Sequence, residues 1–465
     1  MGPRGLALLV LAATLAPAGV AHAFDVQLDA DTSFSIYEVR SQGARAFMAR
    51  RRLLSRVGLR LSHDLTEPDD EGSAIRVLAD VQLRLEQDFG ETCLVDRDLC
   101  VDAIDSNDLS AYQPLATDTR LDVPGVWVGL AGLPLGLSVR VGRQLVLDTI
   151  GFARYDGGAV DFAPVRWFRL QAFGGLLVRG TSLLGTPRSD PQGSIRVDSP
   201  VDVPFVAPPV DTWVIGVSAN GGPGRELQAS VGYRYMWESD GQVLSRLSLA
   251  LSSQPVDGLR MDATGVLDLF TTEIIEARGT VRIGDDTLSG YGQVSRHVPR
   301  FDPGTIWSWF SVAPIDQAEL GASWTVTDDL SLGGSLRGRR AELGGEQGED
   351  LDAGFDAWLR ARWEGFRLEA SGFAWSGSLG PLAGVSLGVR RPILGFVELG
   401  ADVSVWHFDD PLRDYAHGAV VSTALEGRVR ITDETLVFVE LQHAASDAVG
   451  HRFRGIIAIR VETWR

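Results

Sequence analysis

The sequence predicts an all-β fold, a single large antiparallel β-barrel that spans a membrane. Apolar and polar residues alternate along segment after segment, as in Ile75–Glu86 and Leu227–Tyr235. A two-residue period of this kind places successive side chains on opposite faces of a strand. About twenty such segments follow an N-terminal export signal, with almost no helical stretch between them, and short connections alternate with longer ones.

The first 23 residues have the pattern of a signal peptide. Arg4 supplies the positive charge, residues 6–15 form the apolar core, and Ala21–Ala23 is a small-x-small cleavage site. The apolar run is too short for a membrane-spanning helix. We therefore expect a signal peptide over 1–23 and the barrel over 24–465. Strands begin almost directly after Phe24, which leaves no room for a plug domain.

The alternation alone also fits a soluble β-sandwich. There the charged face of each strand would meet water and the apolar face would pack on a second sheet. Sandwich domains are about 100 residues long, however, and no linkers divide this chain into units of that size. Length therefore favours the barrel.

The connections between segments fall into two classes. Short turns are expected at 66–72, 132–136, 221–224, 255–258, 284–286, 327–329, 364–365, 391–392 and 432–434. Longer or irregular stretches lie at 89–120, 146–157, 180–210, 298–316, 340–350 and 407–416. Short turns on one side and longer loops on the other are typical of outer-membrane barrels. Counting through predicts about 22 strands, within a range of roughly 18 to 22, with both termini at the short-turn side.

A local motif adds a family resemblance. Val139–Gln144 contains a Gly-Arg-Gln step, and Arg154–Gly157 contains a Tyr-Asp-Gly step. This pair resembles general porins, in which the first step often lies at the top of a strand and the second follows a loop, before the next strand. As a whole the chain resembles a Gram-negative outer-membrane β-barrel of the porin type. One departure is the C-terminus, where Arg465 follows Trp464 in place of a terminal aromatic residue. The resemblance implies diffusion of small solutes, and because porins often trimerise it leaves a homo-oligomer open.

The main candidates for function are arginines on the polar side of the strands, which we expect to face the lumen. Rings of charge in a pore set its ion selectivity, and guanidinium groups match carboxylates and phosphates. The alternative is that these arginines pair with inward acidic residues and only stiffen the wall. The selectivity candidates are Arg76, Arg84, Arg140, Arg169, Arg234, Arg246, Arg278, Arg282, Arg360, Arg362, Arg428 and Arg430.

The only two cysteines lie close together in one polar loop. In an exported protein, Cys93 and Cys100 are best interpreted as a local disulfide. The acidic residues around them, over 88–108, are a candidate Ca²⁺ site. Their spacing matches no EF-hand, so a solvated surface loop is the favoured interpretation.

The predicted function is an outer-membrane channel for small hydrophilic solutes, with anions favoured by the arginine-rich lumen. The first alternative is an export conduit or scaffold that depends on partner proteins, as in polysaccharide export. A remote alternative is a hydrolase embedded in the barrel. Gly384–Gly388 fits G-x-S-x-G by letter, but it lies inside an alternating strand and lacks the strand-to-helix turn that this motif requires.

The composition also bounds the partners. A net charge of −18 argues against nucleic acid. The expected partners are outer-membrane lipid and small solutes. Diffusion requires no covalent chemistry, and we expect neither an enzyme nor a cofactor or metal.

Overall fold

The structure is a computed structural model, and it describes residues 25–40, 47–67, 74–88, 119–178, 211–239, 241–298, 314–342, 349–377, 380–409, 417–446 and 450–464. Over these residues the chain is almost entirely β-strand, with one short 3-10 turn, η2, at Pro134–Gly136. No helix within these ranges is long and apolar enough to cross a membrane.

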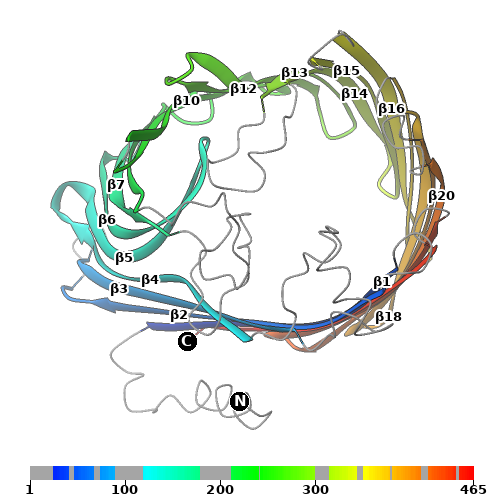
Figure 1. The fold of residues 1–465 in the computed structure, drawn as a ribbon, viewed down its shortest axis with the longest axis horizontal. Helices are drawn as coiled ribbons and strands as arrows, with labels where there is room; N and C mark the ends of the chain where they lie inside the picture. The colour runs from blue at the N-terminus through cyan, green and yellow to red at the C-terminus, as the bar shows by residue number, and fades with distance from the viewer. Residues whose placement is uncertain are drawn as a thin grey trace, which may run out of the picture.

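The strands form one antiparallel sheet that closes on itself (Figure 1). Each strand pairs with the next, and β22 pairs with β1 from Gln27↔Trp464 to Glu38↔Phe453. Closure leaves no free sheet edge, as a membrane barrel requires. The 22 strands are β1 (Asp25–Arg40), β2 (Phe47–Asp64), β3 (Arg76–Asp88), β4 (Thr119–Leu133), β5 (Leu137–Asp148), β6 (Gly151–Val165), β7 (Phe168–Leu177), β8 (Trp213–Gly221), β9 (Gln228–Glu238), β10 (Gly241–Val256), β11 (Leu259–Asp268), β12 (Glu273–Gly284), β13 (Leu288–His297), β14 (Ile315–Thr327), β15 (Leu330–Glu342), β16 (Glu349–Trp363), β17 (Phe366–Ser376), β18 (Leu382–Leu394), β19 (Val397–Asp409), β20 (His417–Thr432), β21 (Thr435–Ser446) and β22 (Gly450–Trp464).

The fold confirms the predicted class, the count of 22 strands and the generic resemblance to an outer-membrane, porin-like barrel. Both ends of the sheet, Asp25 and Trp464, lie at the short-turn end. Two sequence assignments were wrong. Arg391 and Pro392 belong to β18, and the turn follows at 395–396. The stretch 146–157 is not a long connection but the ends of β5 and β6, joined by 149–150.

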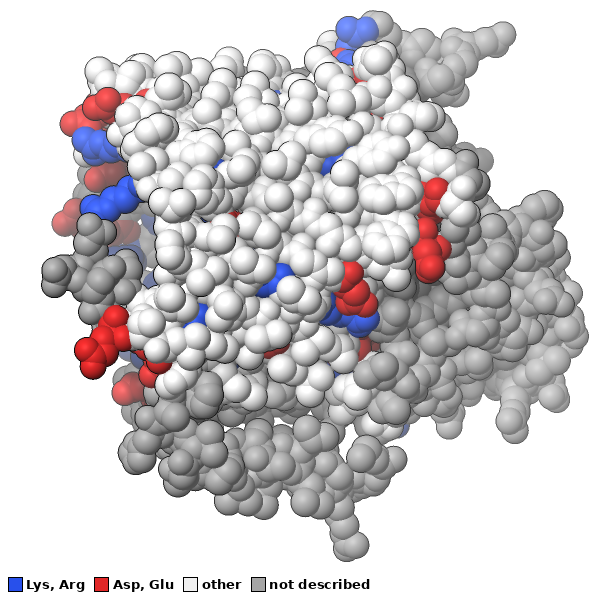
Figure 2. Space-filling view, turned by 90° about the vertical axis from the view of Figure 1, so that its left-hand side faces the viewer, with Lys and Arg blue, Asp and Glu red and all other residues white. Residues whose placement is uncertain are grey.

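The outer face of the barrel is apolar. On β16, Phe355, Leu359 and Trp363 are exposed on one parity, while Asp352 and Asp356 lie on the other. Figure 2 shows this outer face over part of the wall as largely uncharged, with a few charged side chains within it. Such a surface suits contact with acyl chains, so the polar parity must face the lumen.

Candidate permeation pathway

The β5–β6 hairpin leaves the wall and turns into the barrel. β4 pairs with β5 only up to Val126↔Arg143, and β7 pairs with β6 only up to Tyr155↔Leu177. Beyond these points the hairpin tip lies inside the barrel and faces the inner surface of β7–β10 (Figure 1). It therefore narrows the space available to a solute.

A row of glycines permits this bend. Gly142, Gly157 and Gly175 are cross-strand neighbours on β5, β6 and β7, all on the lumen-facing parity. A Cβ on Gly157 would lie 2.0 Å from the carbonyl oxygen of Gly174, and one on Gly175 would lie 2.2 Å from that of Asp156. Because these colliding atoms belong to the main chain, only glycine allows the strands to fold so sharply on their concave side.

A small apolar core fills the space between the hairpin and the wall. Its buried members are Val146, Ala153, Tyr155, Ala159, Phe173, Val214, Met236 and Leu244. Tyr155 and Val214 are completely buried, and the rings of Tyr155 and Phe173 stack with centroids 5.1 Å apart. Stacked aromatic pairs add to the stability gained from burial alone. This core holds the hairpin in its inward position.

Arg234 fixes the tip of the hairpin to β9. Its side chain is 2% exposed. Its Nη2 donates to Asp148 Oδ1 at 2.8 Å and to the carbonyl oxygen of Gly151 at 2.9 Å, and its Nη1 donates to that of Phe152 at 3.3 Å. A buried charge of this kind is tolerated only with such partners. The guanidinium is thus committed to the hairpin and is closed off from solutes.

On its other side the hairpin is joined to β4 by one ion pair and one hydrogen bond to the main chain. Arg154 Nη1 lies 3.0 Å from Asp122 Oδ2. Arg143 contacts Asp156 within the hairpin through two N–O distances of 2.8 Å, and its Nη1 donates to the carbonyl oxygen of Val123 on β4 at 3.4 Å. The contacts of Arg154 with Asp122 and of Arg143 with Val123 replace the main-chain ladder that ends where β5 leaves β4.

The opposite wall, over β16–β20, carries an open network of charges on its inner face. Arg390 lies 3.6 Å from Glu369, 3.5 Å from Asp402 and 3.4 Å from Glu426. Arg428 lies 3.6 Å from Glu426 and 3.8 Å from Glu398. The network lines the lumen with hydrated groups of both signs. The sequence reading missed Arg390 because it placed residues 391–392 in a turn.

Arginines and acidic residues also pair on the remaining lumen wall. On β2 and β3, Arg84 lies 2.9 Å from Glu86, which also contacts Arg52. On β5–β7, Asp161 accepts from Arg140 at 3.0 Å and from Arg169 at 2.7 Å. These pairs are the wall-stiffening arrangement that was the alternative to selectivity.

All twelve arginine candidates lie on the lumen-facing parity, but their environments differ. Eight form an ion pair within 4.0 Å: Arg76, Arg84, Arg140, Arg169, Arg234, Arg246, Arg360 and Arg428. The other four, Arg278, Arg282, Arg362 and Arg430, are exposed and have no ion pair with any described residue. Selectivity stays a prediction for all of them.

Arg278 and Arg282 stand on one strand of the lumen wall. Both belong to β12, with Thr280 between them. The cross-strand neighbours of Arg278 are Thr264 and Ser295, which are neutral. Arg282 lies opposite Tyr291 and Arg260. Asp262 and Glu276 lie on the same face, so the three arginines exceed the carboxylates here by one charge.

Other predicted features fall outside the described residues. These include the signal peptide over 1–23, Cys93 and Cys100, and the loop connecting β3 to β4 with most of the acidic residues of 88–108. In the G-x-S-x-G segment, Ser386 lies within β18, where its hydroxyl is 2.7 Å from that of Ser371 across the β17–β18 pair.

The hairpin was not predicted, although the sequence holds a signal for it. Gly157-Gly158 and Gly174-Gly175 are two glycine pairs in neighbouring strands, and Gly142 interrupts the polar parity of β5. Glycine within a strand often marks a bend or a close approach of backbones. The motif used for the porin resemblance, Val139–Gln144 with Arg154–Gly157, coincides with the base of this hairpin.

No protein-family model matches the sequence, and no curated protein is similar to it. Solved structures with a similar arrangement include Acinetobacter baumannii OccAB4, with 7% identity and a TM-score of 0.44 over 95% of this chain and 98% of that one. Pseudomonas aeruginosa OccK7 (OpdD) has 11% identity and a TM-score of 0.45, over 95% and 99%. The P pilus usher (PapC) translocation pore has 8% identity and a TM-score of 0.47, over 94% and 99%. At these values the likeness is one of strand arrangement alone.

Proposed function

We propose that this chain is an outer-membrane channel through which small hydrophilic solutes diffuse, that it favours anions, and that it is not an enzyme. The observation that carries the proposal is the β5–β6 hairpin, held inside a barrel whose wall is lined by charged and hydrated side chains. A barrel of 22 strands is too wide for wall side chains alone to fill. An inward hairpin gives such a barrel a size limit.

The preference for anions rests on arginines that form no ion pair with a described residue. Arg278 and Arg282 are exposed on the lumen face of β12, and neither forms an ion pair with a described residue. Unpaired positive charges along a pore lower the electrostatic barrier for anions and raise it for cations. The paired arginines contribute less, because a neighbouring carboxylate cancels most of their field.

The experiment is single-channel recording of the refolded protein in a planar bilayer, with the reversal potential measured under a KCl gradient. We expect stable conductance steps and a reversal potential on the anion side. The double variant Arg278→Gln/Arg282→Gln should shift the reversal potential toward zero without abolishing conductance. Arg391→Gln, which changes an arginine on the outer parity of β18, is the control and should leave the reversal potential unchanged.

Two outcomes would contradict the proposal in different ways. A folded barrel without conductance would overturn the channel and favour a conduit that opens only with a partner. A cation-selective channel would overturn only the role of the arginines. We also propose export with removal of residues 1–23, which N-terminal sequencing of the membrane-inserted protein would test.

A further inference from the structure

The lumen face of β16–β19 carries aromatic rings that lie over glycines near the strand ends with the longer connections. Phe373 on β17 and Trp406 on β19 flank Gly384 on β18. Trp375 on β17 lies opposite Gly354 on β16. A Cβ on Gly384 would lie 2.8 Å from Trp406 Cβ and 2.9 Å from Phe373 Cζ, and one on Gly354 would lie 2.5 Å from Trp375 Cδ2. The two glycines therefore give the three rings, here called the aromatic patch, the space to rest against the wall.

The aromatic patch keeps part of its surface open to the lumen. Trp406 is 41% exposed, and Phe373 and Trp375 are partly buried. The guanidinium carbons of Arg337 and Arg339 lie 5.8 and 5.3 Å from the ring centroid of Trp375, and such cation–π contacts hold this ring in position. Open aromatic surface inside a hydrated barrel marks a place where a solute can bury an apolar face of its own.

A row of hydroxyl groups lies beside the aromatic patch, one step further from the longer connections. Ser371, Ser386, Ser404 and Ser422 are cross-strand neighbours on β17–β20. The hydroxyl oxygens of Ser371 and Ser386 are 2.7 Å apart, and Gln442 Nε2 donates to Ser422 Oγ at 3.2 Å. Each hydroxyl both donates and accepts, so this serine row can bond a solute that carries hydroxyl groups.

The G-x-S-x-G segment has a structural explanation in this arrangement. Gly384 makes room for the rings, and Ser386 supplies a hydroxyl to the serine row. A Cβ on Gly388 would lie 2.4 Å from Asp402 Oδ1, so this glycine makes room for the carboxylate. From the longer connections inward, the wall thus offers rings, then hydroxyls, then the charged network around Arg390.

We propose that the aromatic patch and the serine row bind the pyranose rings of small sugars. A pyranose has C–H groups on its faces and hydroxyl groups around its edge. The negative face of an aromatic ring attracts the weakly positive hydrogens of the C–H groups, while hydroxyl and charged side chains bond the edge. The inference rests on the proposed function, because it names a solute for the channel, but sugar binding can be measured without conductance.

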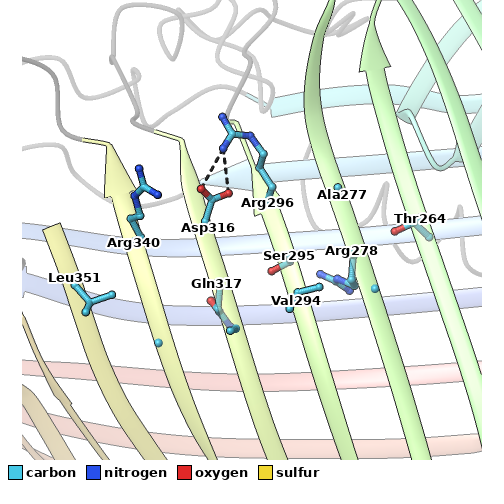
Figure 3. A pocket seen from close by; sticks show the side chains of 13 residues that line it. Thr264, Ala277, Arg278, Val294, Ser295, Arg296, Asp316, Gln317, Arg340 and Leu351 are labelled. Carbon is cyan, nitrogen blue, oxygen red and sulfur yellow. Dashed lines mark hydrogen bonds and ion pairs between the residues drawn. The ribbon is translucent and has the colours of Figure 1, made fainter. Parts of the chain in front are cut away.

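The neighbouring wall over β12–β14 offers hydrogen-bonding groups without the rings. Arg278, Ser295 and Gln317 are cross-strand neighbours there (Figure 3). On these three strands, as the structure describes them, none of the next lumen-facing residues on either side is Phe, Tyr or Trp. Ser295 is therefore a matched control for Ser386, because both serines face the lumen and only Ser386 belongs to a row beside the aromatic patch.

The test is saturation-transfer difference NMR of the full-length barrel in a sugar-free detergent, titrated with cellobiose or with sorbitol, a polyol without a ring. We expect saturation of the ring C–H protons of cellobiose and binding about tenfold weaker for sorbitol. Phe373→Leu/Trp406→Leu keeps apolar side chains but removes two rings, and should weaken cellobiose binding about tenfold. Ser386→Ala should weaken it about threefold, and Ser295→Ala should leave it unchanged.

A pair of glycine variants tests the seat of the rings. Gly384→Ala should displace both rings and weaken cellobiose binding. Gly372→Ala, on the outer parity of β17, meets its nearest atoms at ordinary distances of 3.5 and 3.6 Å and should bind as the unmodified protein does. Heat-modifiable migration on a gel would verify that every variant is folded.

The proposal is overturned if the double leucine variant binds cellobiose as tightly as the unmodified barrel, or if sorbitol binds as tightly as cellobiose. A conducting barrel that does not bind cellobiose would overturn the sugar site alone. A barrel that binds cellobiose through these residues but does not conduct would support the sugar site and overturn the proposed channel.

Discussion

The inner face of the barrel has two sectors, one with buried side chains (the dry sector, β5–β10) and one with solvent-exposed side chains (the wet sector, β16–β20). Over β5–β10 the β5–β6 hairpin covers the wall, and residues such as Tyr155 and Val214 have no exposed surface. Over β16–β20 the inner face is open, and the side chains of Arg360 and Glu369 are 66% and 53% exposed. The outer alternation is the same in both sectors. The difference lies on the inner parity, where β5–β10 carry an apolar core beneath the hairpin and β16–β20 carry exposed charged side chains.

The comparison implies that the two sectors gain stability from different sources. The dry sector has a core of the kind found in soluble proteins, where packing density makes each change costly. The wet sector depends on ladder hydrogen bonds, the lipid outside and exposed ion pairs that contribute about 0–1 kcal/mol each. Matched substitutions in the two sectors should therefore differ widely in effect.

The largest expected effect is that of Gly157→Val. Its Cβ would collide with main-chain atoms of Gly174 and Gly175 at 2.0 and 2.7 Å, so the hairpin should no longer fold inward, at a cost of about 4 kcal/mol or more. Urea unfolding in detergent would measure the loss, and single-channel steps should become larger. Gly338→Val, at an open position of the outer face, should cost less than about 1 kcal/mol. Equal losses in the two variants would refute the special role of the glycine row.

Phe173→Ala should follow in size. It removes the ring that stacks on Tyr155 and leaves a cavity in a closed core, which costs about 3–4 kcal/mol. The matched change Phe373→Ala lies on the inner face of the wet sector, where the ring is only partly buried, and should cost less than half as much. The same unfolding experiment compares them, and a larger loss in Phe373→Ala would reverse the assignment of the two sectors.

Arg234→Gln tests whether a buried arginine in the dry sector contributes more to stability than an exposed arginine in the wet sector. It leaves Asp148 and the carbonyl oxygens of Gly151 and Phe152 without their donor. Since the Asp148 side chain is 25% exposed, we expect a loss of about 2 kcal/mol, below the usual range for a fully buried pair. Arg360→Gln, in an exposed pair 3.4 Å from Glu369, should cost less than about 0.5 kcal/mol. Noisier conductance in Arg234→Gln alone would indicate a loosened hairpin.

The smallest effect concerns a turn outside both sectors. Asp285, between β12 and β13, accepts the N–H groups of Leu288 at 2.9 Å and Thr287 at 2.8 Å. These hydrogen bonds hold the pKa of its carboxyl below the ordinary value. The stabilisation is therefore present at neutral pH and is lost as pH falls through the lowered pKa. The urea midpoints of the unmodified protein and Asp285→Ala should differ slightly at pH 7 and converge below about pH 4.

Most of the fold could be predicted because lipid imposes a strict rule on the outer face. Every second residue must be apolar, so alternation identifies both the strands and their inward side, as on Phe355–Trp363. The rule fails where a strand leaves the membrane. At 146–157 one face of the hairpin packs on a protein core, so the residues on that face, Val146, Ala153 and Tyr155, are apolar. Leu147 and Phe152 on the opposite face are apolar too, and the alternation of apolar with charged residues is lost.

The candidate site could be predicted only in part for a similar reason. Parity gives the side of the wall on which an arginine lies but not its partners, which come from register and distance. Arg234 and Arg278 look alike in sequence, yet one is enclosed by a turn that lies more than 80 residues earlier and the other is exposed. Likewise, parity places Phe373 and Trp406 on the inner face, but only the register brings both of them beside Gly384.

Arg234 binds the hairpin largely through atoms that every sequence shares. Two of its three contacts go to the main-chain oxygens of Gly151 and Phe152, and the side chain of Leu147 on the far face of the hairpin is 80% exposed and takes no part. The contacts of Arg234 therefore do not depend on most of the side chains at the hairpin tip. Evolution or design could replace the side chains on that face and so change which solutes pass, while the barrel and the position of the hairpin stay the same.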